Sequence, residues 1–234
     1  MPDHIGAFLK ASECFASLGI NITRVSYNKA IDSHTLFLDA EGSPEKLADV
    51  DLIIACGDLK PSYLEFFATM SKAPVVYVLG NHDHWHLHKE AEGCICLEDT
   101  IYEYNGIRIL GLGGSMRYLP ETPCQYTEKE MEKRIKKLRW KLFCKKGFDI
   151  LVTHSPAQGF HDLDDLPHQG FACFRKLIKD YKPKLFIHGH VHSNYSSEFI
   201  REDNLGDTKV INAYDYYYIY KFFNGIVIWK TAFF

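Results

Sequence analysis

The sequence predicts an α/β protein in which a two-sheet β-sandwich is flanked by helices, with a short α-β-β segment added at the N-terminus. Three observations support this fold class. Short apolar runs, which are typical of strands buried on both faces, alternate with segments of helical periodicity. Four of these runs end directly at small groups of Gly, Asp, Asn, Thr or His. Asn105 and Gly106 separate two further strand-like runs, which strongly indicates a hairpin.

The N-terminal part predicts a helix followed by a hairpin and a second, shorter helix. Apolar residues recur at helical spacing over residues 3–18. Residues 21–31 and 34–41 then have the composition of two strands. Ser followed by Pro is a favourable helix start, so a short helix is expected over 44–48.

The rest of the chain predicts alternating strands and helices. Each strand is a short, mostly apolar run bounded by turn formers. The longest helix carries Met131, Ile135, Leu138 and Leu142 on one stripe, so one of its faces should pack against a sheet. In chain order, strands are expected at 52–56, 74–79, 100–104, 107–112, 150–152, 185–187, 210–213 and 226–229, and helices at 62–70, 127–146 and 171–181.

The composition is that of an ordinary globular protein. Hydrophobic residues make up 46% of the 234 residues, and 27 Lys and Arg stand against 30 Asp and Glu, which gives a net charge of −3. This balance creates no global field toward nucleic acid or membranes. The chain has no apolar run approaching a membrane span and no secretory leader pattern, and its 7 cysteines are scattered without a C-x-x-C pair. We therefore expect a cytoplasmic protein.

The polar groups at the ends of four predicted strands are metal-ligand types. Strands that lie side by side bring their carboxyl ends to one edge of a sheet, so these groups can meet there. Carboxylate, amide and imidazole ligands together suit divalent ions such as manganese, iron, cobalt, nickel or zinc. The glycines among them permit tight turns close to such a site. The four groups are Gly57-Asp58, Gly80-Asn81-His82-Asp83, Thr153-His154 and Gly189-His190-Val191-His192.

These four groups, in this order and spacing, resemble the motifs of the calcineurin-like metallophosphoesterase family over about residues 50–215. The resemblance implies a hydrolase that attacks a phosphate monoester or diester with a hydroxide activated by two divalent ions. Manganese is the ion expected first, with iron, zinc, cobalt or nickel as alternatives. The expected substrate is a small phosphorylated molecule.

The same resemblance implies a role for each motif residue. Asp58 would bridge the two metals. His82 would contact a phosphate oxygen or the leaving group, and Asp83 would orient His82. His192 would bind one metal, and the shell of the other metal would be completed by Asn81, His154 and His190.

The N-terminal part departs from the family pattern. The family opens with a buried strand that ends in D-x-H, whereas residues 5–47 of this chain resemble part of an ACT small-molecule-binding module. We therefore expect an ACT-like segment at 1–47 that contributes to the sheet, and a phosphoesterase domain at 48–234. Through the ACT-like segment the chain could also form a homo-oligomer.

Two acidic residues are candidates for the missing first ligand. Asp32 and His34 have the D-x-H letters, but the residues before them are too polar for a central parallel strand. Asp39 follows a clearly apolar run that could lie beside the strand at 52–56. We therefore expect Asp39 to bind the metal shared with His192, and Asp32 to face solvent.

Two further features have both a functional and a structural interpretation. Nine Lys or Arg residues on the helix at 127–146 could bind nucleic acid or an anionic substrate, but a solvated helix face is preferred. Neither nucleic acid nor a membrane is expected as a partner. The histidines at 84, 86 and 88 could form a second metal site, but an exposed loop at the mouth of the site is preferred. The rival to the enzyme is a regulatory or scaffold protein with an impaired metal site and an ACT-like segment for ligand binding or association.

Overall fold

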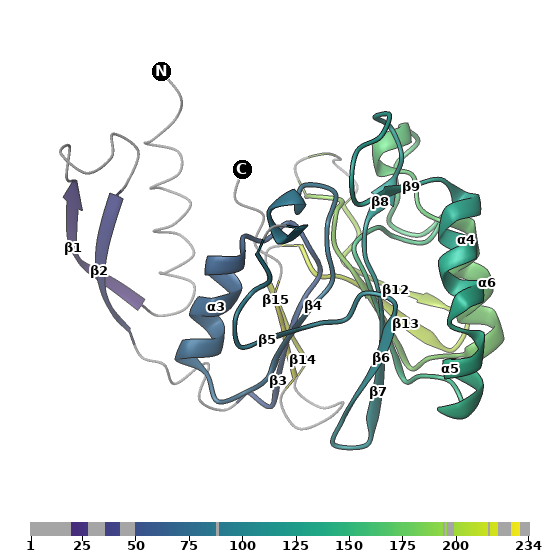
Figure 1. The fold of residues 1–234 in the computed structure, drawn as a ribbon, viewed down its shortest axis with the longest axis horizontal. Helices are drawn as coiled ribbons and strands as arrows, with labels where there is room; N and C mark the ends of the chain where they lie inside the picture. Colours follow the sequence, from purple (N-terminus) through teal and green to yellow (C-terminus); the bar gives the residue numbers. More distant parts are fainter. Residues whose placement is uncertain are drawn as a thin grey trace.

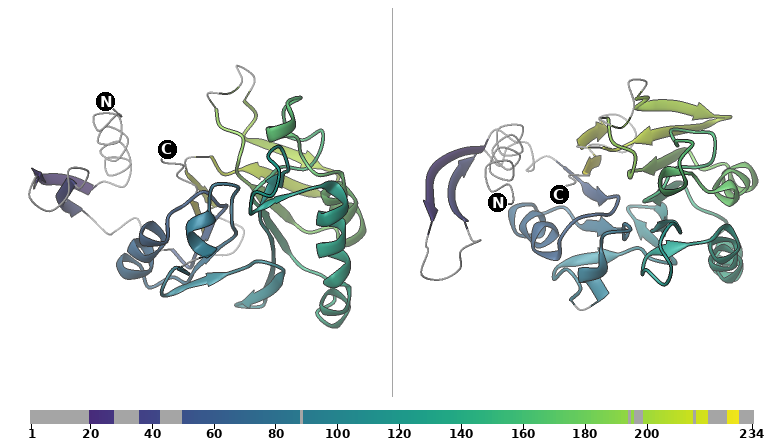
Figure 2. Two further views of the ribbon diagram at one scale, coloured as in Figure 1. Left: turned by 45° about the horizontal axis from the view of Figure 1, so that its top comes forward. Right: turned by 90° about the horizontal axis from the view of Figure 1, so that it is seen from above.

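Two β-sheets packed face to face, with helices on both outer faces, make up the body of the protein (Figure 1). The computed structural model describes residues 20–27, 36–42, 50–87, 89–193, 195, 199–214, 216–219 and 226–229. Figure 2 shows the order of the layers, from helix α3 through the two sheets to the helices of the opposite face. The predicted mixed α/β fold, a sandwich flanked by helices, is therefore present.

Parallel strands form the centre of the larger sheet. β10 (Ile150–Thr153) lies between β7 (Ile107–Leu112) and β11 (Leu185–His188), and β13 (Thr208–Asn212) pairs with β11. Antiparallel strands close both edges. β6 (Thr100–Tyr104) pairs with β7 across the predicted Asn-Gly turn, in which both residues have positive φ. At the other edge β12 (Glu202–Leu205) pairs with β13.

The smaller sheet has β3 (Leu52–Ala55) between β15 (Ile226–Trp229) and β4 (Val75–Tyr77), all three parallel. β5 (Cys94–Cys96) extends the sheet beside β4, and β14 (Tyr216–Ile219) pairs antiparallel with β15. Every residue of β3 and β4 is buried. This burial on both faces explains why these strands are continuous apolar runs.

Apolar side chains from both sheets form the central core. Ile54 and Val76 of the smaller sheet share one cluster with Ile109, Val152 and Ile187 of the larger sheet, and all five are fully buried. Each such side chain contributes roughly 1.5–3 kcal/mol by leaving water. Because this core fixes one sheet against the other, it also fixes the relative positions of the strand ends that carry the predicted ligands.

Helices cover both outer faces of the sandwich (Figure 1). α3 (Pro61–Met70) packs on the smaller sheet through Leu64 and Phe67. The helix predicted over 127–146 is interrupted at Leu138, which separates α4 (Glu128–Lys137) from α5 (Arg139–Cys144). Both pack on the larger sheet together with α6 (Ala172–Tyr181).

Within the described residues, no helix is long and apolar enough to cross a membrane. The remaining short elements are β8 (Ser115–Met116), β9 (Gln125–Tyr126) and the 3-10 turns η1 (His84–Leu87) and η2 (Leu166–His168).

The N-terminal strands do not join either large sheet. β1 (Ile20–Tyr27) and β2 (Leu36–Gly42) form an antiparallel pair of their own, as the hairpin prediction requires. The prediction that this segment contributes to the main sheet is wrong, because β15 and β4 occupy the two positions beside β3. The apolar β15 suits a central parallel position, and Asp39 instead sits within a hairpin strand. The helices predicted at 3–18 and 44–48, and the D-x-H letters at 32–34, lie outside the described residues.

Candidate metal centre

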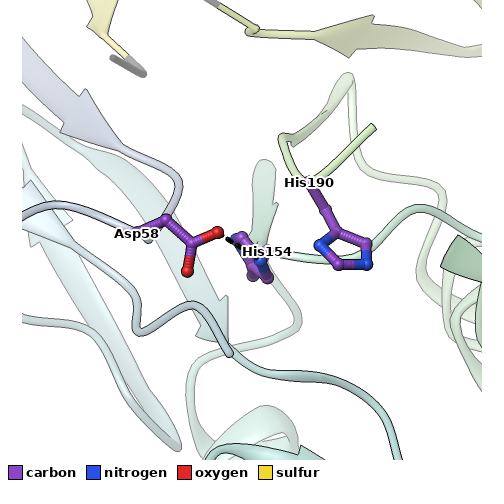
Figure 3. A group of neighbouring side chains, drawn as sticks. All are labelled: Asp58, His154 and His190. Carbon is purple, nitrogen blue, oxygen red and sulfur yellow. Dashed lines mark ion pairs between the residues drawn. The ribbon is translucent and has the colours of Figure 1, made fainter. Parts of the chain in front are cut away.

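The predicted ligand groups converge at one end of the sandwich. Asp58 follows β3 and Asn81 follows β4 in the smaller sheet, whereas His154 follows β10 and His190 follows β11 in the larger sheet. Donor atoms of Asp58, His154 and His190 all lie within 4.8 Å of one another (Figure 3). The expectation that strand ends bring these groups together is confirmed for these three residues, although two sheets contribute instead of one.

His154 shows most directly that the centre suits a cation. Its fully buried ring places Nδ1 2.7 Å from the carbonyl oxygen of Cys56. Nδ1–H therefore donates to that carbonyl, and in the neutral tautomer Nε2 presents a lone pair. Nε2 lies 2.9 Å from Oδ1 of Asn81 and 3.3 Å from Oδ2 of Asp58. A lone pair that faces two oxygen acceptors is the arrangement expected around a divalent metal.

The side chain of Asn81 is oriented by Tyr118, a residue that sequence reasoning missed. Nδ2 of Asn81 donates to the Tyr118 hydroxyl at 3.1 Å, which leaves Oδ1 toward His154. The Tyr118 loop is itself held by Gln125, because Oε1 of this buried glutamine accepts the backbone N–H of Tyr118 at 3.2 Å. Tyr118 lies in an irregular loop after β8, where the sequence has no strand-end pattern.

Backbone strain and close packing surround Asp58. Asp58 has φ of 59°, in the left-handed region that few non-glycine residues adopt, and such residues often cluster at functional sites. A Cβ on Gly80 would lie 2.0 Å from Oδ1 of Asp58, so only glycine fits there. The same Oδ1 accepts the backbone N–H of His82 at 3.0 Å. The two loops after β3 and β4 therefore approach too closely for any side chain at Gly80.

Asp83 and His82 have different surroundings. Asp83 is buried, and its Oδ2 accepts the backbone N–H groups of Asp58 and Gly80, both at 2.7 Å. Through these hydrogen bonds Asp83 holds the two ligand loops together. This role differs from the predicted one, which was to orient His82. His82 is exposed at the mouth of the site.

The loop after β11 contributes both His190 and His192. Nε2 of His190 lies 2.7 Å from the carbonyl oxygen of Pro167, and its ring is 4.7 Å from that of His154 between centroids. His190 has φ of 67°, a second left-handed non-glycine residue at the centre. His192 is buried, and its ring stacks on Tyr195 at 4.7 Å. His192 thus lies near the centre but outside the group of three.

A small pocket of about 160 Å³ opens at this centre. Pro167 and His168 of the short 3-10 turn η2, together with Tyr195, add a wall that the sequence did not predict, because these segments have no periodic pattern. Nδ1 of His168 lies 2.6 Å from Oδ2 of Asp165, which fixes the ring beside His190. The lining residues are Asp58, Asn81, His82, Tyr118, Pro167, His168, His190, His192 and Tyr195.

The histidines that follow the Gly-Asn-His-Asp group do not form a second metal site within the described residues. His86 is buried against Tyr77, and its Nε2 lies 2.7 Å from the carbonyl oxygen of Leu59. Burial lowers the pKa of His86, which favours its neutral form. His84 is exposed, and His88 lies outside the described residues. Asp39 is described only by its backbone in β2.

Comparisons with known proteins agree with this geometry. A family model described as calcineurin-like phosphoesterase matches residues 30–194. The uncharacterized protein MJ1162 of Methanocaldococcus jannaschii is 27% identical over 175 residues, which cover 69% of this chain and 76% of that protein. Metallophosphoesterase domain-containing protein 1 of Homo sapiens is 29% identical over 159 residues, which cover 64% of this chain but only 45% of that relative.

A solved structure shares the fold. The crystal structure of TT1561 of Thermus thermophilus superposes with a TM-score of 0.52 at 21% identity, and the match covers 88% of this chain and 84% of that chain. At this identity the likeness concerns the fold alone. The family match begins at residue 30 and therefore also includes Asp32, His34 and Asp39.

Proposed function

The chain belongs to the calcineurin-like phosphoesterase family, and from this premise we propose that it hydrolyses a phosphate monoester or diester with the help of two divalent metal ions. The single observation that carries the proposal is the surrounding of His154. In the neutral tautomer, Nε2 of His154 carries no proton, yet it faces the oxygens of Asn81 and Asp58. The ring of His190 lies beside that of His154. A cation at this point would bind all four side chains.

The residues of the chain have separate tasks in this proposal. Asp58 would supply negative charge to both cations, while Asn81, His154 and His190 would hold one of them. His192 would hold the other, together with a donor from the N-terminal part of the chain. When bound, the metals neutralise the charge of the phosphate and lower the pKa of the attacking water. Manganese is the preferred ion of the proposal, since carboxylate, amide and imidazole ligands suit it.

His82 and Asp83 complete the proposed machinery. His82 is exposed at the pocket mouth, where its ring can donate a hydrogen bond to a phosphate oxygen or protonate the leaving group. Asp83 keeps the loops of Asp58 and Gly80 together through two backbone hydrogen bonds. The pocket of about 160 Å³ suits the phosphate end of a small phosphorylated molecule. None of the cysteines in the described part of the chain forms a disulfide, which supports a cytoplasmic setting.

Elemental analysis and turnover together test the proposal. The purified chain, incubated with Mn²⁺ and then desalted, should retain about two metal ions and hydrolyse p-nitrophenyl phosphate or bis-p-nitrophenyl phosphate. Relative rates on these two compounds would distinguish a monoesterase from a diesterase. A chain that binds no metal and turns over neither compound would contradict the proposal and favour the regulatory or scaffold alternative.

A further inference from the structure

The outer surface of α5 carries two large aromatic side chains that face solvent. Trp140 is 74% exposed and Phe143 is 75% exposed, which makes them the most exposed large hydrophobic residues of the described chain. Their rings stack on each other, with centroids 5.8 Å apart and planes at 29°. Together they form a contiguous apolar surface that contributes nothing to the core, and such surfaces mark interaction sites.

Exposed Lys and Arg residues precede and follow this aromatic pair along α4 and α5. Within the described residues, two of them form ion pairs: Lys136 with Glu132 at 3.4 Å and Lys145 with Glu103 at 2.9 Å. The chain as a whole carries a net charge of −3, whereas residues 127–146 carry nine Lys or Arg against three Glu, so this segment has a local excess of positive charge. We call the set the basic aromatic patch; it consists of Trp140 and Phe143 with the exposed Lys133, Lys136, Lys137, Arg139, Lys141, Lys145 and Lys146.

We propose that the basic aromatic patch docks the protein on an anionic lipid surface. Trp and Phe side chains insert at the boundary between lipid headgroups and acyl chains, while neighbouring lysines contact the headgroups. Lysine stems are long enough to lie along the apolar contact and keep their charges at the headgroups. The contact is peripheral, because α5 (Arg139–Cys144) only presents one face to the lipid. The proposal departs from the expectation, made from net charge alone, that a membrane is not a partner.

The groove beside the patch argues against single-stranded nucleic acid as the partner. Proteins that bind such strands combine a basic groove for the phosphate backbone with exposed ring faces for the bases. A cavity of about 530 Å³ lies between α4, α5 and α6, but its lining has mixed charge, because Glu132 and Asp180 stand among the cations Lys136, Arg139 and Lys176. It is therefore not the uniformly basic groove that a phosphate backbone would follow. Trp140 and Phe143 already stack on each other, which leaves fewer ring faces for bases. A lipid surface needs neither a groove nor separate ring faces.

The patch and the candidate metal centre lie at different places in the fold. The lining of the pocket and the patch share no residue. In Figure 1, α5 lies at the lower end of the helical layer, whereas β8 and β9, which flank the Tyr118 loop, lie at its upper end. Docking through the patch therefore leaves the pocket open to solvent.

Vesicle co-sedimentation with the full chain tests this proposal without any reference to activity. The protein should bind vesicles of phosphatidylcholine mixed with phosphatidylserine, bind pure phosphatidylcholine much more weakly, and dissociate as salt is raised. The double variant Trp140→Ala/Phe143→Ala should lower the partition coefficient at least about tenfold. Lys137→Glu should lower it about fivefold or more.

Matched variants control for surface changes elsewhere. Met70→Ala/Ile200→Ala removes two exposed apolar side chains outside the patch, and Lys72→Glu makes the same charge change on another face; both should bind as the unaltered chain does. Circular dichroism checks that each variant is folded. The proposal is overturned if the chain binds poly(U) but no vesicles, if it binds neither, or if vesicle binding survives both patch variants unchanged.

Discussion

The carboxylate of Asp83 lies 2.7 Å from the backbone nitrogen of Asp58 and accepts its N–H, and the same oxygen accepts the N–H of Gly80. One buried carboxylate thus connects the loop that ends β3 to the loop that ends β4. These loops present Asp58 and Asn81 to His154. The last residue of the Gly-Asn-His-Asp group is therefore part of the frame that holds two candidate ligands in place.

Asp83→Ala should weaken metal binding and destabilise the fold. The substitution leaves two N–H groups near the buried site without their acceptor, which costs about 1–3 kcal/mol for each. Calorimetric titration with Mn²⁺ should show a higher Kd, and urea unfolding should show the loss of stability. Asp83→Asn keeps an acceptor oxygen and should recover part of both losses.

Asp83→Ala in a His82→Ala background separates the two roles considered for Asp83. If Asp83 acts by holding the loops, Asp83→Ala should weaken Mn²⁺ binding equally whether or not His82 is present. If Asp83 acts only through His82, then Asp83→Ala should add nothing once His82 is removed, and the metal Kd should not change. The second result would contradict the structural role.

Asp58→Asn should abolish turnover and lower the metal content. The amide keeps the size of the side chain but supplies a neutral oxygen where negative charge between two cations is needed. Elemental analysis and p-nitrophenyl phosphate hydrolysis measure the two effects. Asp180→Asn on the exposed face of α6 is the matched control and should change neither. Full metal content and activity in Asp58→Asn would mean that Asp58 is only a turn residue.

His82→Ala should keep its metal and lose rate by roughly 10²–10⁴-fold, as expected for a positioned acid or phosphate contact. The loss should be smaller for p-nitrophenyl phosphate than for an alkyl phosphate, because a good leaving group needs less protonation. His84→Ala changes a neighbouring exposed histidine and should have little effect. Equal losses on both substrates would rule out protonation of the leaving group by His82.

Arg134→Ala should destabilise the fold far more than changes on the exposed face of α4. Arg134 points inward, with its guanidinium 2.5 Å from Glu98 and 2.9 Å from Asp99, and Glu98 in turn accepts the N–H of Leu79 just before the Gly80 loop. Breaking a largely buried pair leaves uncompensated charge and costs about 3–5 kcal/mol. Urea unfolding should show this loss, whereas Lys129→Ala on the exposed face should stay within about 0.5 kcal/mol. A small effect of Arg134→Ala would mean that solvent screens the pair.

The sequence predicted the parts of the fold that depend on local pattern. β3, β4, β10 and β11 are buried, and such strands are short apolar runs whatever their neighbours. Each is followed by a polar ligand type, so the convergence of Asp58, His154 and His190 could be expected before any coordinates. The β6–β7 hairpin is equally local, because its turn requires positive φ at Asn105 and Gly106.

Long-range placement could not be predicted in the same way. The strand at 226–229 was recognisable, but nothing local indicates that it pairs with β3 from the far end of the chain. Tyr118 comes from an irregular loop, and its hydrogen bond to Asn81 depends on tertiary structure. The hydrogen bond between His168 and Asp165 is local, but the position of His168 beside His190 also depends on tertiary structure. The inward orientation of Arg134 on a basic helix likewise depends on Glu98 and Asp99.

The donor that accompanies His192 can be found by comparing Asp32 with Asp39. Asp39 was preferred because its strand was expected beside β3, but β2 pairs with β1 and Asp39 stands opposite Arg24 in that hairpin. The family match begins at residue 30 and includes the D-x-H letters of Asp32 and His34. We therefore expect Asp32→Ala to lower the metal content from about two ions to about one, and Asp39→Ala to leave it near two. His34→Ala should act as Asp32→Ala does, since both letters of the motif would bind the same ion. If only Asp39→Ala loses one ion, then Asp39 is the ligand despite its position in the hairpin. If the unaltered chain binds a single ion, the two-metal proposal itself is contradicted.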